Sequence, residues 1–282
     1  MIDQVKVFEQ GVGFEPEKLP LVLPDLSDTA YHANKHVLTS SRARKLITHS
    51  PAHVRASLDN PTETKSMVFG KVVHALLLED EVFARRFQVR KKYDGRSKAG
   101  KALTESYNET LGNRTPVPQD VYDDAMRAVG SAAKLFGECG VSEEVSMFEH
   151  SFYAEVGGVA CAARPDILTD NGDGTYTMVD VKTSADLEAW SFLRSCQRYG
   201  YFTQFLHYCQ VLAACGYIVN RVRILAVENS EPFTARVFAV PMTRIEQEAA
   251  SLAVARDTWK HCISTGEWDG WPAEVFDLED IL

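Results

Sequence analysis

No stretch of the 282 residues is long and apolar enough to cross a bilayer as a helix, and Met1-Ile2-Asp3-Gln4 does not begin a signal peptide. We therefore expect a cytoplasmic protein with no membrane partner. The six cysteines include no Cys-x-x-Cys pair, so zinc-knuckle and iron–sulfur cluster spacings find no match. We expect reduced thiols, most of them buried.

Positive charge is scarce, because 30 lysines and arginines stand against 39 acids, for a net charge of −9. The total argues against a nucleic-acid partner, but its distribution matters more. Residues 85–101 hold a single acid, Asp94, among many cations. We interpret this segment as a mobile basic loop that touches DNA phosphates, with a solvated charge run as the alternative. Its candidate contacts are Lys91, Lys92, Arg96 and Lys98.

The same segment imitates a nucleotide-binding loop. Gly95 to Lys101 matches the pattern Gly-x-x-x-x-Gly-Lys, but Ala102 follows where a Ser or Thr would be needed to hold Mg²⁺. Arg90-Lys91-Lys92 precedes it in place of a buried strand. We therefore expect no ATP binding.

Hydrophobic periodicity predicts an α/β fold with one central mixed sheet flanked by helices. The sheet comprises three antiparallel strands, then a helix, then two further strands. Residues 1–30 are expected to form an irregular N-terminal arm, and 31–282 one domain, with a helical layer at 31–140 and an α/β core at 141–282. The predicted strands are 145–156, 158–168, 175–183, 222–227 and 233–240. The predicted helices are 42–50, 53–58, 65–78, 98–111, 120–136, 186–215 (broken near Gly200) and 244–264.

Two acidic residues lie on apolar runs that flank a hairpin signal. Asn171-Gly172-Asp173-Gly174 separates Asp166 from Asp180, and folding about that tip brings the two acids opposite each other, give or take one residue. Two carboxylates about 5 Å apart repel unless a cation neutralises them, and Mg²⁺ prefers such oxygens. Lys182 follows on the same strand face as Asp180. A surface salt bridge is the alternative interpretation of Asp-x-Lys.

Two helical segments supply further candidates. Gly70 and His74 lie one turn apart, so the glycine would leave room for a metal beside the imidazole, although a lone helical histidine is more often packed in a core. Gln204 and Tyr208 share a helix face and could hydrogen-bond a phosphate or the attacking water. Alone, they indicate only an amphipathic helix.

Taken in order, these motifs resemble a known family. Gly-x-x-x-His at 70–74, Pro-Asp at 165–166, Asp-x-Lys at 180–182 and Gln-x-x-x-Tyr at 204–208 are similar to the PD-(D/E)XK nuclease superfamily, in its RecB-like branch. Within that branch, the runs Leu38–His53 and Phe69–Leu76 resemble the nuclease domain of RecE-type exonucleases (exonuclease VIII).

The resemblance implies a Mg²⁺-dependent exonuclease that digests linear double-stranded DNA from 5′ to 3′ and leaves 3′ single strands for recombination. Mn²⁺ should substitute for Mg²⁺. It also implies a ring-shaped homo-oligomer, such as a tetramer, and a single-strand annealing partner. A structure-specific or restriction-type endonuclease, or a non-catalytic scaffold that binds DNA ends, are the alternatives.

The residues receive roles on this hypothesis. Metal ligands are Asp166, Asp180, the Val181 carbonyl and His74. Lys182 orients the hydroxide, and Gln204 and Tyr208 position the DNA backbone. Candidates for a pocket that holds a terminal 5′-phosphate are Arg42, Arg44 and Lys45.

Overall fold

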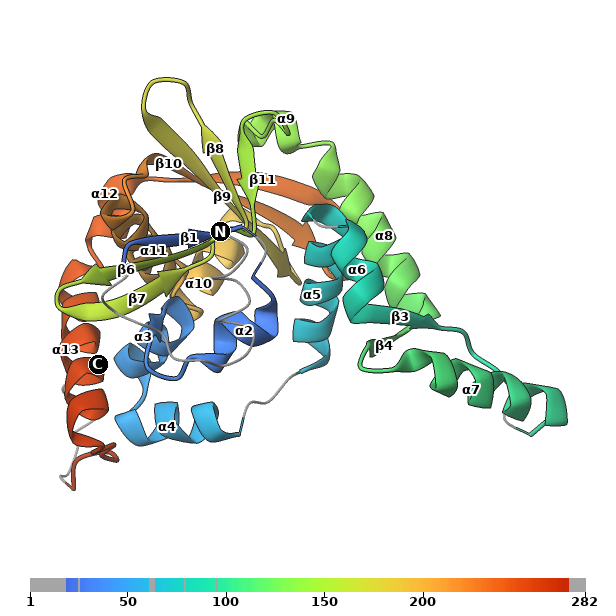
Figure 1. Cartoon of the computed structure of the whole chain (residues 1–282). Helices are drawn as coiled ribbons and strands as arrows, with labels where there is room; N and C mark the ends of the chain where they lie inside the picture. The colour runs from blue at the N-terminus through green and yellow to red at the C-terminus, as the bar shows by residue number, and fades with distance from the viewer. Residues whose placement is uncertain (1–18, 25, 61–63, 79, 95, 274–282) are drawn as a thin grey trace.

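Helices and strands alternate along the chain, and the computed structural model describes residues 19–24, 26–60, 64–78, 80–94 and 96–273 (Figure 1). The strands are β1 (Leu21–Leu23), β2 (Leu38–Thr39), β3 (Phe87–Arg90), β4 (Thr115–Pro118), β5 (Ser146–Phe148), β6 (Ser151–Val156), β7 (Val159–Ala163), β8 (Ile167–Asp170), β9 (Thr175–Ser184), β10 (Ile218–Glu228) and β11 (Ala235–Val240). The helices are α2 (Asp28–Ala33), α3 (Ser40–Thr48), α4 (Pro51–Asp59), α5 (Lys65–Leu78), α6 (Asp80–Arg86), α7 (Lys98–Leu111), α8 (Gln119–Ala133), α9 (Phe136–Cys139), α10 (Ala189–Arg198), α11 (Tyr201–Ala214), α12 (Met242–Glu246) and α13 (Ala249–Thr265). Within the described ranges, each helix is too short or too polar to span a membrane.

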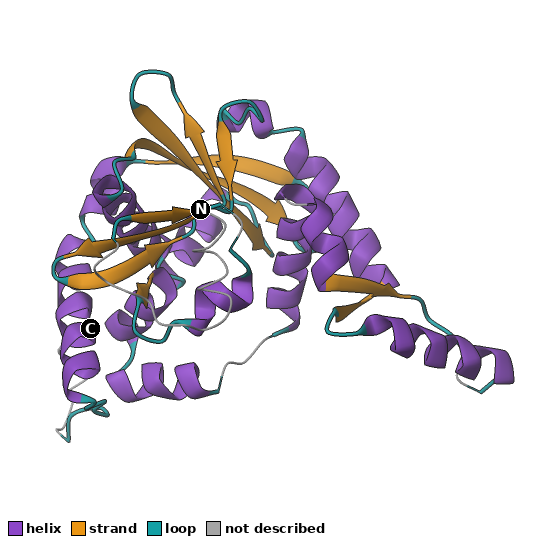
Figure 2. Ribbon diagram, viewed as in Figure 1, coloured by secondary structure: helices purple, strands orange, loops and turns teal. Residues whose placement is uncertain are grey.

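Two main sheets take the place of the single sheet that the sequence predicts (Figure 2). One has five strands in the order β11-β10-β9-β8-β5, with β9 and β10 parallel and the other neighbours antiparallel. The other has four strands in the order β1-β6-β7-β2, and β3 pairs with β4 in a separate ribbon. The α/β class, with mixed sheets flanked by helices, is confirmed. The expectation of one sheet is wrong.

The sheets separate because two neighbouring predicted strands each bend, and the two bends lie side by side. The run 145–156 bends at Glu149, whose φ is 52°, and continues as β6. The run 158–168 bends at Arg164-Pro165-Asp166, where proline cannot donate to a ladder. The Glu149 N–H donates to the Asp166 carbonyl oxygen at 3.0 Å, which joins the two bends. Glu149 and Asp166 therefore lie where the hairpin passes from one sheet to the other.

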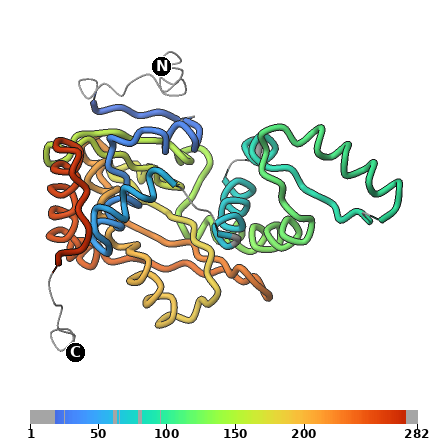
Figure 3. Tube along the Cα trace, turned by 90° about the horizontal axis from the view of Figure 1, so that it is seen from below, coloured from blue at the N-terminus to red at the C-terminus, as the bar shows by residue number. Residues whose placement is uncertain are grey.

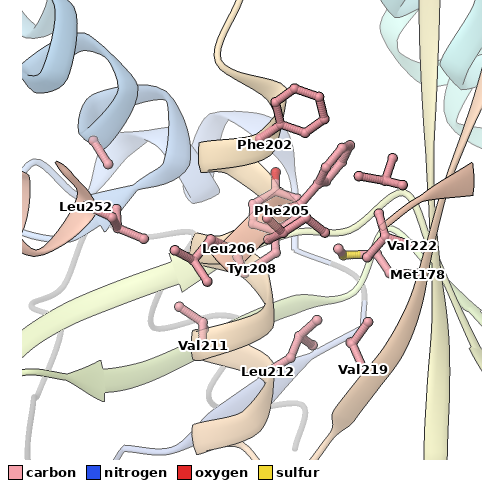
Figure 4. Packing of buried hydrophobic residues seen from close by; sticks show 14 of the residues in the cluster. Met178, Phe202, Phe205, Leu206, Tyr208, Val211, Leu212, Val219, Val222 and Leu252 are labelled. Atoms are coloured by element: carbon pink, nitrogen blue, oxygen red, sulfur yellow. The ribbon is translucent and has the colours of Figure 1, made fainter. Parts of the chain in front are cut away.

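The five-stranded sheet is buried on both faces. Met178 packs in one apolar cluster with Phe205 of α11 (Figure 4). Val179 and Val181 belong to a second cluster, on the face covered by α5 and α8. Because successive strand residues point to opposite faces, Asp180 lies on the α11 side. Each fully buried apolar side chain contributes about 1.5–3 kcal/mol, so the frame around Asp180 is rigidly held.

Most helix boundaries agree with the sequence. The bounds predicted for α5 and α7 are those observed, and Gly200, with φ 64°, breaks the run 186–215 into α10 and α11. The predicted arm is partly wrong, since β1 pairs with β6 and the Ser27 side chain caps α2. That strand is only three residues long and lies between prolines, too short for periodicity to reveal. Residues 1–18 of the predicted arm lie outside the described residues.

Candidate active site

The hairpin brings the two predicted acids together. β8 and β9 pair with Ile167 opposite Val179, and continuing this register by one residue sets Asp166 opposite Asp180. Asp180 is fully buried and Asp166 is 8% exposed. The two acids are close enough for the Asp180 charge to raise the pKa of Asp166, as their predicted proximity requires.

Asp166 lies closest to a histidine and to a third acid. The ligand atoms of His74, Glu149 and Asp166 all lie within 4.8 Å of one another, a set that could hold a metal ion. The His74 Nδ1 is 3.7 Å from Glu149 Oε1 and also 3.7 Å from Asp166 Oδ2. Burial raises the pKa of Asp166 to about 7, with the Asp180 and Glu149 charges adding to the rise and His74 opposing it.

Val181 holds two of these side chains through its backbone. Its N–H donates to Asp166 Oδ2 at 2.6 Å, and its carbonyl oxygen lies 2.9 Å from His74 Nε2. A proton on Nε2 therefore leaves Nδ1 facing the carboxylates, as in metal-binding histidines that are oriented by a backbone carbonyl. Burial acts to lower the pKa of His74, but Asp166 and Glu149 outweigh it and raise that pKa to about 9. Val181 is thus placed to orient the ligands, and its carbonyl is already engaged by His74.

Asp180 has its own partners. Gln204 Nε2 donates to Asp180 Oδ1 at 2.7 Å, and Lys182 Nζ lies 2.5 Å from Oδ2. This ion pair is the contact that the described part of the chain gives to the buried Oδ2. Burial lowers the pKa of Lys182, but Asp180 and Asp166 outweigh it and raise that pKa overall.

The donor set fits a divalent cation. Carboxylates that are buried close together repel one another unless positive charge is supplied, and the single ammonium of Lys182 is paired with Asp180. Three carboxylates, from Glu149, Asp166 and Asp180, gather beside one imidazole, and oxygen ligands of this kind suit Mg²⁺ or Mn²⁺. His74, Asp166 and Asp180 were predicted as ligands.

A cleft of about 1370 Å³ opens over this site. His74, Glu149, Asp166 and Lys182 line it. Cationic side chains also reach it from several elements: Arg44, Lys45, Lys71, Arg86, Arg198 and Arg244. Arg86 and Arg244 are paired with Asp28 and Glu248, which also line the cleft. The protein's net charge is negative, yet the other cations could contact an anionic polymer in this cleft.

Several predicted residues lie elsewhere. Arg42 is buried, and its guanidinium donates to the carbonyl oxygens of Asn34, Val37 and His32. Arg42 does not line the cleft, unlike Arg44 and Lys45.

Tyr208 and Gln204 also differ from their expected roles. Tyr208 is 8% exposed, packs in the core around α11 (Figure 4) and does not line the cleft. Burial raises its pKa well above the usual value, with the Ser40 hydroxyl as its polar contact. Gln204 is 5% exposed and donates to Asp180, and neither Gln204 nor Tyr208 lines the cleft in which DNA would lie.

The basic segment lies apart from the cleft. Lys91, Lys92, Arg96 and Lys98 are exposed and do not line it. They belong to the part of the chain formed by β3, α7 and β4, which projects from the body in two perpendicular views (Figures 1 and 3). These four residues could contact only DNA that extends beyond the cleft, and that contact stays a prediction.

The sequence did not reveal Glu149 or Tyr201. Glu149 falls inside an expected strand, and the only signal is that Glu149-His150 interrupts two apolar runs. Tyr201 opens α11, and its ring centroid lies 4.9 Å from Lys182 Nζ, a cation–π contact. The sequence around Tyr201, an aromatic residue after Gly200, does not indicate its contact with Lys182.

The mixed sheets, with two acids and a lysine on adjacent strands at the sheet junction, define a protein of the PD-(D/E)XK nuclease type. Residues 40–275 match the family described as the PDDEXK-like domain of unknown function (DUF3799), and the chain belongs to that family.

A solved structure has a similar fold. The crystal structure of an exonuclease candidate from Eubacterium rectale has a TM-score of 0.58 at 12% identity, over 91% of this chain and 98% of that one. At this identity the likeness shows the fold alone. A phage-related exonuclease from Haemophilus somnus 129PT (TM-score 0.36, 12% identity, 84% and 100% covered) and the alkaline exonuclease LHK-Exo from Laribacter hongkongensis (TM-score 0.30, 12% identity, 82% and 92% covered) are more distant. The comparison with curated proteins gives no match.

Proposed function

We propose that this protein is a Mg²⁺-dependent exodeoxyribonuclease that digests linear double-stranded DNA. One observation carries the proposal: a fully buried Asp180, bonded by Gln204 and paired with Lys182, lies beside the His74, Glu149 and Asp166 cluster under a cationic cleft. A scaffold that only binds DNA ends would gain nothing from three mutually repelling carboxylates.

The residues divide the chemistry between them. Glu149, Asp166 and Asp180 would hold the ion, with His74 as a further ligand. A bound Mg²⁺, for which Mn²⁺ substitutes, polarises the scissile phosphate and lowers the pKa of a bound water. The Lys182 pKa is raised by Asp180, so its ammonium stays protonated and orients the attacking water rather than accepting its proton.

Hydrolysis then leaves defined products. The water oxygen would attack phosphorus and release a proton to solvent, the bond from phosphorus to O3′ would break, and the departing O3′ would take up a proton from solvent. The products are a 5′-phosphate and a 3′-hydroxyl. The Lys182 charge offsets the negative charge that builds on the phosphate oxygens during attack.

The finer features rest on the family resemblance and on the exonuclease names of the structural neighbours. They are digestion from 5′ to 3′, a ring-shaped oligomer, cytoplasmic location and an annealing protein as partner. Arg44, together with Lys45, is the candidate for contact with a terminal 5′-phosphate, because both line the cleft. A native mass measurement gives the oligomer size. The contact of Arg44 with the phosphate is tested by comparing how fast wild type and Arg44→Ala digest DNA with 5′-phosphorylated and with 5′-hydroxyl ends.

The decisive assay is a time course on end-labelled linear duplex and on closed circular DNA, with Mg²⁺ or with EDTA. Wild type should degrade the linear DNA only with Mg²⁺, and Asp180→Asn and Lys182→Ala should lose this activity. Lys134→Ala is the matched control, since Lys134 is exposed at the end of α8 and does not line the cleft. Nicking of the circle would indicate an endonuclease. Binding of ends without digestion would indicate a scaffold.

A further inference from the structure

The turn between α10 and α11 presents two stacked aromatic rings to the cleft. Tyr199 caps the end of α10, Tyr201 begins α11, and Gly200 between them adopts the left-handed conformation. The two ring centroids lie 6.0 Å apart with an interplanar angle of 27°. Both tyrosines line the cleft, and Tyr199 is 55% exposed. One side of the stack is thus accessible from the cleft or the solvent around it.

The stack continues inward to the catalytic lysine. Lys182 Nζ lies 4.9 Å from the centroid of Tyr201, and Tyr201 stacks on Tyr199. The Arg198 guanidinium also lies near Tyr199, 5.8 Å from its ring centroid. Lysine, inner ring and outer ring therefore follow one another from Lys182 to the exposed Tyr199.

The turn that carries the rings is held in place. Arg44 Nη1 donates to the Tyr199 carbonyl oxygen at 2.8 Å. The stem of Arg44 also packs so close to Gly200 that an added Cβ would lie 3.1 Å from Arg44 Cδ. A glycine is needed here both for this contact and for its φ of 64°. The platform is pre-organised, so a ligand need not order it on binding.

We propose that Tyr199 and Tyr201 form a stacking platform for an unpaired nucleobase of the strand whose phosphate reaches Lys182. This inference rests on the proposed nuclease function and names the form of DNA that the cleft takes: a frayed or single-stranded end. Every base has a π-face, so such a platform tolerates all sequences. Arg44 and Arg198 flank it with positive charge for the sugar–phosphate backbone.

The test compares DNA with and without the bases that would stack. Wild type in EDTA, where cleavage stops, is titrated with a fluorescent duplex that ends in a short single-stranded extension, and with the same duplex carrying abasic residues in the extension. Tyr199→Ala should weaken binding of the intact extension about fivefold or more and leave the abasic DNA unchanged. Tyr199→Trp should restore the affinity.

Trp190→Ala is the matched control, because Trp190 is 70% exposed on the same helix and does not line the cleft. It should bind both DNAs as wild type does. Equal losses by Tyr199→Ala on intact and abasic DNA, or no loss on either, would overturn the stacking role. If wild type still digests linear DNA in that case, the nuclease function stands. If wild type neither digests DNA nor binds either duplex, both proposals fall.

Discussion

Replacing Gln204 with leucine should remove the hydrogen bond that holds the buried Asp180 carboxylate, without changing the shape of the core. The Gln204 amide donates to Asp180 Oδ1 at 2.7 Å, and both side chains are buried. Oδ2 is paired with the Lys182 ammonium, which the substitution leaves in place. A hydrogen bond to a charged group contributes about 1.5–3 kcal/mol, so Gln204→Leu should lower the free energy of unfolding by about 2 kcal/mol in the metal-free protein.

A double-mutant cycle isolates this bond from other effects of the substitution. Denaturant unfolding of wild type, Gln204→Leu, Asp180→Ala and the double variant in EDTA should give a coupling energy of about 1.5–3 kcal/mol. Digestion of linear DNA with Mg²⁺ should fall about 10- to 100-fold in Gln204→Leu, as expected for a residue that orients a metal ligand. Gln210→Leu is the control on the same helix, since Gln210 bonds Arg256 and not the acid. A coupling energy near zero, with unchanged digestion, would refute the role given to Gln204.

Three other predictions concern different parts of the molecule. Glu149→Gln should weaken Mn²⁺ binding about 10- to 100-fold while leaving the fold intact by circular dichroism, and wild-type affinity would remove Glu149 from the ligand set. Burial lowers the pKa of His207 to about 4. Between about pH 6.5 and pH 4 this histidine is therefore protonated in the unfolded chain but neutral in the folded protein, so the free energy of unfolding decreases as the pH is lowered through that window. From pH 7 to 5, wild type should lose about 2 kcal/mol of unfolding free energy more than His207→Gln does, whereas parallel losses would contradict it. Arg42→Met should lower the free energy of unfolding by about 3 kcal/mol, because three carbonyl oxygens lose their donor. The variant should keep the wild-type preference for 5′-phosphorylated ends. A changed preference would show that Arg42 contacts the terminal phosphate.

Local pattern was enough to place the acid pair. The hairpin signal at 171–174 and the strand period set Asp166 against Asp180 and turned Lys182 to the same face, and these depend only on nearby residues. The helix bounds of α5 and α7 followed in the same way from periodicity and capping residues.

Long-range contacts explain what the sequence concealed. The division into two sheets depends on a bend at Glu149 that is bonded to another bend at Asp166, and this contact joins residues 17 positions apart in the sequence. For Arg42, a position near a helix start suggested an anion site, but the loop at 32–37 folds back and accepts three hydrogen bonds from its guanidinium. Gln204 was assigned to the substrate because its partner, Asp180, is 24 residues away.

The central claim is that the acids at the sheet junction hold a divalent cation under the cleft. A crystal soaked in Mn²⁺ and measured at the manganese absorption edge tests it most directly. The account predicts an anomalous peak bonded to Asp166 and Asp180, with His74 or Glu149 completing the ligand set, and no peak in Asp180→Asn. A soaked crystal of an active preparation with no manganese beside Asp166 or Asp180 would contradict it.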